Sequence, residues 1–206
     1  KIAIEIRNLQ RTEIAEVSEH FKKGQMGSSA VPTKRNPIKS ERISSLSKLL
    51  RSQISTSFEN IPLWHERDLS NSANERFILP MTSILLDEML ETMTKIIGNL
   101  QVDTKRVQEN LHITKGQIFA EFVLEALIKK GIPRIKAYRD VQRVAFAAHK
   151  KGINFMNALE NDKAVSSILS DKEIKSVFVA KNHLGASLSI IDNVERHVKV
   201  NSKKFS

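Results

Sequence analysis

The feature that most constrains the fold is one long helical pattern between residues 72 and 100. Apolar side chains recur along it at heptad-like spacing: Leu79, Leu86, Leu90, Met93, Ile97 and Leu100. Such spacing places side chains along one side of a helix, as in the seam of a coiled coil. A helix of nearly thirty residues is about 45 Å long at 1.5 Å per residue, which is longer than a compact domain of this size requires. The pattern therefore predicts a bundle of long helices that is shared between copies of the chain.

Most of the remaining chain also repeats apolar residues at helical spacing, and alternating strand patterns are scarce. The predicted fold class is therefore all-α. An opening helical pattern runs over residues 1–20. A second helix is expected from Pro37, with Asn36 as its N-cap, to about Asn60, and its buried face should include Ile54 and Phe58. The long third helix should begin at a capping box made by Ser72 and Glu75.

The pattern changes to shorter helices from about residue 113, with breaks at Gly131, Gly152 and Gly185. We therefore expect a helical-bundle domain over residues 1–112 and a small helical domain over residues 113–206. The chain has no initiator Met and opens inside a helical pattern. We accordingly expect that a further part of the protein precedes it.

The charge balance points to anionic partners. The formal net charge is +10, which suits nucleic acid, acidic lipid or a small phosphorylated or carboxylated substrate. Aromatic residues are only 5%, which argues against a platform that stacks single-stranded bases. There is no cysteine, and the six histidines show no metal-binding spacing, so we expect no metal site. No apolar run approaches the roughly 18 residues of a membrane helix, so we expect no membrane partner.

Residues 24–37, "GQMGSSAVPTKRNP", concentrate small, hydroxyl-bearing and basic residues in a chain with only 7 Gly and 5 Pro. Such a loop can offer hydroxyls, backbone N–H groups and cations to an anion, next to a helix N-terminus that also favours negative charge. It can equally be a polar surface connector with a basic tip, which is the more common role of such residues. The composition of the segment leaves both interpretations open.

The segment from Gly27 to Pro37 resembles the signature of the fumarase/aspartase superfamily, Gly-Ser-Ser-x-Met-Pro-x-Lys-x-Asn-Pro. Val31 stands where that signature has Met, which alters how the loop packs. Within the superfamily, "KRNPIKSER" and "ENIPLWHERDLSNSANER" look like the adenylosuccinate lyase family. The likeness is strong over about residues 1–100 and general beyond them.

The resemblance implies a carbon–nitrogen lyase that eliminates fumarate from adenylosuccinate, giving AMP, and from the succinylaminoimidazole carboxamide ribotide of purine biosynthesis. It implies a cytoplasmic homotetramer without a cofactor, with active sites shared between subunits. Residues 1–112 would form the C-terminal half of the central bundle domain, with the signature loop at about 23–37. The catalytic histidines of the family precede the signature, so the chain alone should be inactive.

The resemblance also assigns roles to residues of the signature. Ser28 is the expected general base, activated by nearby cations and N–H groups. Lys34 and Asn36 match positions that hold the succinyl carboxylates, and Ser29 is a weaker candidate for the same pocket, since it can equally be a turn hydroxyl. Glu41 matches a glutamate that pairs with a histidine acid of another subunit, although a first-turn glutamate also suits the helix dipole.

Three further residues, Arg67, Ser72 and Arg76, match positions that bind the nucleotide phosphate, although Ser72 can also be only a helix cap. Arg42 is a candidate near that site, and a solvated helix arginine is its more common role. His65 is expected to be a packed or capping residue, and not the catalytic acid or base.

Two other classes of function stay open beside this lyase. One is another fumarate-releasing lyase of the superfamily. The other is a basic, non-catalytic helical module that binds nucleic acid, whose affinity would fall steeply with salt, whereas a lyase would bind its nucleotide specifically.

Overall fold

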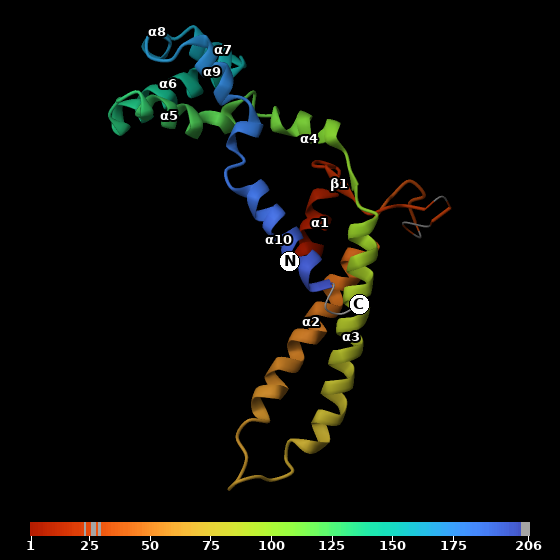
Figure 1. Cartoon of the computed structure of the whole chain (residues 1–206). Helices are drawn as coiled ribbons and strands as arrows, with labels where there is room; N and C mark the ends of the chain where they lie inside the picture. Colours follow the sequence, from red (N-terminus) through yellow and green to blue (C-terminus); the bar gives the residue numbers. More distant parts are fainter. Residues whose placement is uncertain (23, 26–27, 29, 203–206) are drawn as a thin grey trace. The chain divides into compact units, whose positions relative to one another are not determined.

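A computed structural model describes residues 1–22, 24–25, 28 and 30–202 (Figure 1). It divides into two compact units, Lys1–Asn110 and Leu111–Ser206. Both are built from helices, which confirms the predicted all-α class. In the described residues the only strands are a pair two residues long. The predicted domains, 1–112 and 113–206, stay a prediction.

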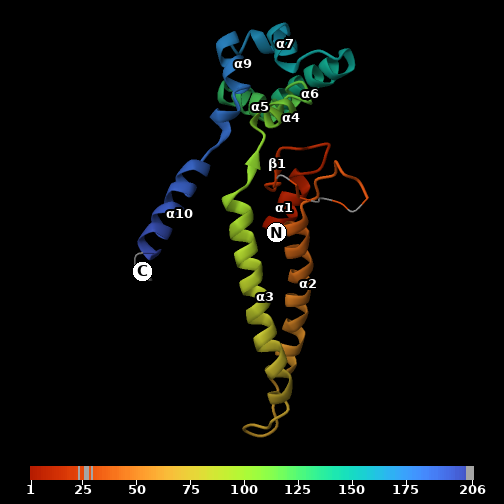
Figure 2. The same ribbon diagram turned by 90° about the vertical axis from the view of Figure 1, so that its right-hand side faces the viewer.

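The first unit is dominated by a hairpin of two long helices, α2 (Ile38–Glu59) and α3 (Ser72–Gly98). The two lie side by side along their length (Figures 1 and 2). Ion pairing supports this packing, because Arg42 of α2 lies 2.9 Å from Glu88 of α3. The hairpin is the long-helix element that the heptad-like spacing predicts.

The opening helical pattern is only partly realised. Helix α1 (Ile2–Leu9) ends well before residue 20, and β1 (Val17–Ser18) pairs antiparallel with β2 (Gln101–Val102). The expectation of a helix through Val17 is therefore wrong. Helix α4 (Thr104–Leu111) holds the intervening turn, since Arg106 and Asn110 both donate hydrogen bonds to the carbonyl of Ile14.

The start of α2 differs from the expected cap. Pro37 is the residue that flanks the helix, not Asn36, and it makes no side-chain cap. The carboxylate of Glu19 caps the helix instead, because it accepts hydrogen bonds from the backbone N–H groups of Lys39 and Ser40. The prediction of Asn36 as N-cap is wrong because a side chain 20 residues upstream satisfies these donors.

The start of α3 also differs. Ser72 is the first helical residue and makes no capping box with Glu75. Asn71 precedes it with helical dihedral angles, and its side-chain amide donates to Glu75. Pro80 lies inside α3, where it removes one backbone donor.

The heptad-like positions of α3 do not share one environment. Met93 and Leu100 pack against a small core of the first unit, formed by Ala3, Ile6, Ile43 and Ile96. Leu90, by contrast, is 59% exposed, and Leu79, Leu86 and Ile97 are exposed as well. On α2, Ile54 and Phe58 are exposed too, so the expectation that they are buried within the chain is wrong.

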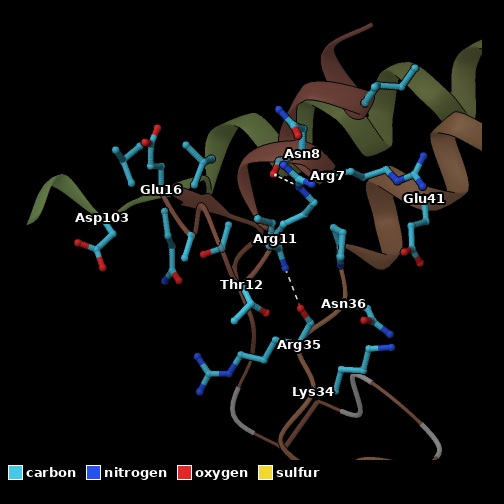
Figure 3. A pocket seen from close by; sticks show the side chains of 18 of the residues that line it. Arg7, Asn8, Arg11, Thr12, Glu16, Lys34, Arg35, Asn36, Glu41 and Asp103 are labelled. Carbon is cyan, nitrogen blue, oxygen red and sulfur yellow. Dashed lines mark hydrogen bonds between the residues drawn. The ribbon is translucent and has the colours of Figure 1, made fainter. Parts of the chain in front are cut away.

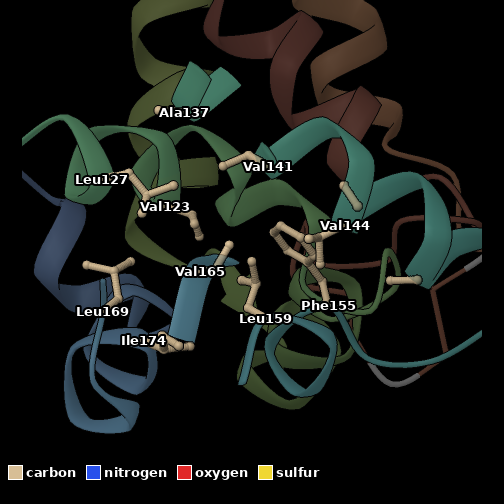
Figure 4. Packing of buried hydrophobic residues seen from close by; sticks show 12 residues of the cluster. Val123, Leu127, Ala137, Val141, Val144, Phe155, Leu159, Val165, Leu169 and Ile174 are labelled. Atoms are coloured by element: carbon tan, nitrogen blue, oxygen red, sulfur yellow. The ribbon is translucent and has the colours of Figure 1, made fainter. Parts of the chain in front are cut away.

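The second unit has its own core (Figure 4). Its elements are, in chain order, η1 (Gln117–Phe119), α5 (Ala120–Lys129), α6 (Arg134–Lys151), α7 (Phe155–Glu160), α8 (Lys163–Ser166), α9 (Asp171–Val177), η2 (Ala180–His183) and α10 (Ser187–Ser202). Buried side chains from α5, α6, α7 and α9 meet, and Phe155 and Leu159 are fully enclosed. The predicted breaks at Gly131 and Gly152 are confirmed, because α5 and α6 end just before these residues.

Gly116 shows how a single residue fits the second core. Its φ is +89°, and a Cβ atom there would lie 2.9 Å from Cε1 of Phe178. Any other residue would therefore strain the backbone and displace an aromatic ring of the core. In the part of the chain that the structure describes, no helix is both long and apolar enough to cross a membrane.

Candidate functional site

The first unit contains a pocket of about 1140 Å³ (Figure 3). It lies between the end of α1, the turn after it, residues 33–37, the start of α2 and the segment around β2. The described residues that line it include five basic ones and three acidic ones. The basic residues are Arg7, Arg11, Lys34, Arg35 and Lys105, and the acidic residues are Glu16, Glu41 and Asp103. Because the cations outnumber the carboxylates, the pocket attracts an anion while keeping carboxylates that can accept hydrogen bonds.

Three of the sequence-predicted site residues meet in this pocket. Lys34 and Asn36 lie on the segment that leads into α2, and Glu41 lies on the first turns of that helix (Figure 3). A turn fixes the start of this segment, because the N–H of Lys34 donates to the carbonyl of Val31 at 3.1 Å. The pocket therefore offers a cation, an amide and a carboxylate from one short stretch of chain. We call residues 33–41 the signature arm.

Ser28 lies in the loop before the signature arm. Its Oγ accepts hydrogen bonds from the N–H groups of Ala30 at 3.3 Å and Val31 at 3.2 Å. Two N–H donors aimed at one hydroxyl oxygen favour negative charge on that oxygen. Ser28 is not among the described residues that line the pocket. Ser29 lies outside the described residues.

Two residues that the sequence analysis missed hold the signature arm. Gln10, at the end of α1, donates from its amide nitrogen to the carbonyl of Arg35 at 2.9 Å. The amide oxygen of Gln10 accepts from the N–H of Glu19 at 3.0 Å. Glu19 is only 7% exposed, and its carboxylate caps α2. No local sequence signal marks either residue, because their partners lie 9 to 25 residues away.

The predicted phosphate-binding residues lie at the opposite end of the α2–α3 hairpin. Arg67 is in the connection over residues 60–71, and Ser72 and Arg76 are on the first turns of α3 (Figure 1). From Glu41 to its end, α2 rises about 27 Å at 1.5 Å per residue. Within one copy, the structure therefore does not bring these residues together with the signature arm.

The connection over residues 60–71 is ordered by polar contacts. The side-chain amides of Asn60 and Asn74 exchange two hydrogen bonds of 2.7 Å. The carboxylate of Asp68 accepts from the hydroxyl of Ser70, from the N–H of Trp64 and from the N–H of Ser70, and these bonds lower the pKa of Asp68. A negative charge is thus kept next to Arg67 in the chain.

His65 lies in the same connection, but it is exposed and has a φ of 53°. This exposure contradicts the packed alternative of the expectation, whereas the capping alternative stays a prediction. Arg42 forms an ion pair with Glu88 and is not among the described residues that line the pocket. In the described ranges, no group of three or more His, Asp or Glu side chains is placed to hold a metal ion.

Two family models and a curated protein match the chain. The family model "Adenylosuccinate lyase C-terminus" matches residues 116–194, and the model "Lyase" matches residues 1–49. An adenylosuccinate lyase of Thermotoga maritima is 41% identical over 196 residues, which is 95% of this chain and 46% of that protein. The chain thus spans about half the length of the curated relative that it matches.

Solved structures share the fold. The 3-carboxy-cis,cis-muconate lactonizing enzyme of Pseudomonas putida is 28% identical with a TM-score of 0.77, over 90% of this chain and 41% of that one. A fumarate lyase of Mesorhizobium sp. BNC1 has a TM-score of 0.79 at 23% identity, over 94% of this chain and 42% of that one. At this identity the second likeness concerns the fold alone.

Proposed function

Because the chain belongs to the adenylosuccinate lyase family of the fumarase/aspartase superfamily, we propose that its protein removes fumarate from adenylosuccinate, leaving AMP. The same elimination would act on the succinylaminoimidazole carboxamide ribotide of purine biosynthesis. The observation that carries the proposal is that Lys34, Asn36 and Glu41, to which the resemblance assigns roles, line one pocket. The pocket's surplus of cations suits the two carboxylates of a succinyl group.

The difficult step is the removal of a proton from carbon beside a carboxylate, because negative charge develops there before the carbon–nitrogen bond breaks. We assign the base to Ser28. A hydroxyl is a weak base, and the N–H groups of Ala30 and Val31 that point at its Oγ would stabilise the alkoxide that it must become. The amine then leaves with a proton from an acid, which by the resemblance is a histidine from a region of the protein that precedes the signature.

Lys34 and Asn36 would hold the succinyl carboxylates, Lys34 by charge and Asn36 by its amide donor. As negative charge spreads into a carboxylate, both contacts become stronger than in the bound substrate, and this difference accelerates the reaction. Glu41 would accept a hydrogen bond from the histidine acid of another copy. Glu41 lines the pocket and is exposed, so it is accessible to such a partner.

The separation along the hairpin supports a site that several copies share. A mononucleotide that carries a succinyl group is much shorter than the stretch of α2 between Glu41 and the connection that holds Arg67. If the signature arm holds the succinyl end, then Arg67, Ser72 and Arg76 of a different copy must hold the phosphate. We therefore propose a homotetramer whose exposed apolar residues on α3 pack between copies.

The proposal includes no cofactor and a cytoplasmic location. The absence of cysteine suits a reducing compartment. The basic charge that could serve nucleic-acid binding is partly accounted for, because five of the cations line this pocket.

The test is fumarate release by the full-length protein, followed by ultraviolet absorbance. Lys34→Ala should lose about 10- to 100-fold in kcat/KM for adenylosuccinate, because a charged hydrogen bond is worth about 1.5–3 kcal/mol. The matched control is Lys48→Ala, an exposed lysine of α2 outside the pocket. The chain of residues 1–206 alone should release none. Equal turnover by the Lys34 and Lys48 variants, or release from a different succinyl compound only, would contradict the proposal.

A further inference from the structure

We propose that Gln10 and Glu19 are positioning residues that hold the signature arm in its reactive place. Gln10 is among the described residues that line the pocket and Glu19 is not; in this account both act through the arm and not on the substrate, and the inference rests on the proposed function of that arm. The two residues form a continuous set of hydrogen bonds, which we call the relay. Gln10, at the end of α1, bonds to the backbone of Arg35 and of Glu19, and the carboxylate of Glu19 bonds to the first turn of α2.

The first half of the relay is Gln10. An amide side chain has a donor and an acceptor, so it can bridge two backbone groups at the same time. Gln10 donates to the carbonyl of Arg35 at 2.9 Å and accepts from the N–H of Glu19 at 3.0 Å. The carbonyl of Arg35 lies between Lys34 and Asn36 in the chain, so the contact is made between the two carboxylate-binding candidates.

The second half is Glu19. Its carboxylate accepts from the N–H of Ser40 at 2.6 Å and from that of Lys39 at 3.3 Å. These donors belong to the first turn of α2, where backbone N–H groups have no partner within the helix and the dipole favours an anion. A short hydrogen bond to a buried carboxylate is strong and directional. The backbone of this first turn, which is followed directly by Glu41, is thereby held in place.

If Glu19 were only a helix cap, it would stabilise α2 without affecting the residues that line the pocket. The relay does more, because Gln10 binds the arm on one side of Asn36 and Glu19 binds it on the other. Both anchors also meet each other through the N–H of Glu19. The arm is thus held at two points, one on each side of Asn36: the carbonyl of Arg35, next to Lys34, and the N–H groups of Lys39 and Ser40, next to Glu41. A displacement of about 1 Å in such residues lowers the rate by about 100-fold.

The experiment uses the full-length protein and a double-mutant cycle. Gln10→Met removes the bridge and nearly keeps the volume. We expect a 10- to 100-fold loss of kcat at a temperature well below the melting point, with the assembly intact. In the Lys34→Ala background the same change should cost clearly less than in the wild type, because one of the two residues that it positions is gone. If Gln10→Met should fail to assemble, Gln10→Glu keeps the size and the acceptor for the N–H of Glu19, and replaces the donor to Arg35 by a charged carboxylate oxygen that repels the carbonyl.

The matched control is Gln53→Met. Gln53 also donates to a backbone carbonyl, that of Leu49, but within α2 and away from the pocket. Its kcat should stay within twofold of the wild type. Equal kcat values for the two methionine variants, or a loss for Gln10→Met that is the same in both backgrounds, would overturn the positioning role.

A second readout separates this inference from the proposed function. In hydrogen-exchange mass spectrometry, peptides that contain Lys39 and Ser40 should exchange at least tenfold faster in Glu19→Gln than in the wild type. Glutamine at position 19 presents an NH₂ group to one of these donors. If the wild-type protein releases no fumarate but this exchange difference is found, the proposed function fails and the relay stands. Unchanged exchange would refute the relay whatever the activity.

Discussion

Replacing Leu90 tests whether the exposed face of α3 is an interface between copies. Leu90 is 59% exposed in the single chain. Complete burial of a leucine side chain contributes about 1.5–3 kcal/mol, so covering the exposed part on assembly is worth about 1–2 kcal/mol per copy. Leu90→Ala should remove most of this contribution. Leu90→Glu should add the cost of an unpaired charge in an apolar contact, which is larger.

Sedimentation velocity of the full-length protein over a range of concentrations measures the effect. The wild type should sediment as a tetramer, Leu90→Ala should dissociate at higher concentrations than the wild type, and Leu90→Glu should not form the tetramer. Ile135→Glu is the matched control, because Ile135 is 69% exposed but lies on α6 in the second unit. A monomeric wild type, or a Leu90→Glu variant that assembles like the wild type, would refute the reasoning.

Three further predictions concern the second unit and the proposed phosphate-binding residue Arg76. Hydrogen bonds from Lys130 and then Ser170 lower the pKa of Glu173 from 4.5 to about 2, so the unfolded chain binds more protons between these values and stability rises with pH there. The melting-temperature difference between wild type and Glu173→Gln should therefore be full above pH 4.5 and disappear as the pH falls toward 2; a constant difference in thermal melts would count against it. Phe155→Ala should cost about 3–5 kcal/mol of stability in urea unfolding, because the ring is fully buried, and a cost below about 1 kcal/mol would show that the site collapses. Arg76→Ala should raise KM for adenylosuccinate about tenfold or more through the lost charged contact, whereas a change in melting temperature alone would make Arg76 structural.

Periodicity predicted the long helices, because it reflects which faces must be buried, but it did not predict the early end of α1. The long helix α3 and the breaks before Gly131 and Gly152 followed from apolar spacing and from glycine as a helix terminator. The exposure of Leu90 and Phe58 could not be predicted, since periodicity marks an apolar face without saying whether the same chain or another copy covers it.

Helix caps show the limit of local motifs. The pattern Ser-x-x-Glu occurs at Ser72 and again at Ser170. At Ser170 the residue is extended and both bonds of the capping box form with Glu173. At Ser72 the preceding Asn71 already has helical dihedral angles, so the hydroxyl lies inside the first turn and cannot cap it. The local backbone before the motif decides the outcome, and the motif does not encode it.

The candidate site was predictable where it follows the chain and not where it depends on tertiary contacts. Lys34, Asn36 and Glu41 are close in sequence, and they line one pocket. Gln10 and Glu19 act over 9 to 25 residues, and only the folded arrangement of α1 against α2 brings them to the arm. The distance between the arm and Arg76 likewise follows from the length of α2 and not from any motif.

The most direct test of the proposed shared site is a crystal structure of the full-length Ser28→Ala variant with adenylosuccinate bound. We expect the succinyl carboxylates to contact Lys34 and Asn36 of one copy, with the removed Ser28 hydroxyl facing the carbon that loses its proton. The phosphate should lie between Arg67 and Arg76 of another copy. A nucleotide bound away from the signature arm, or a phosphate held by the copy that also holds the succinyl group, would contradict the account.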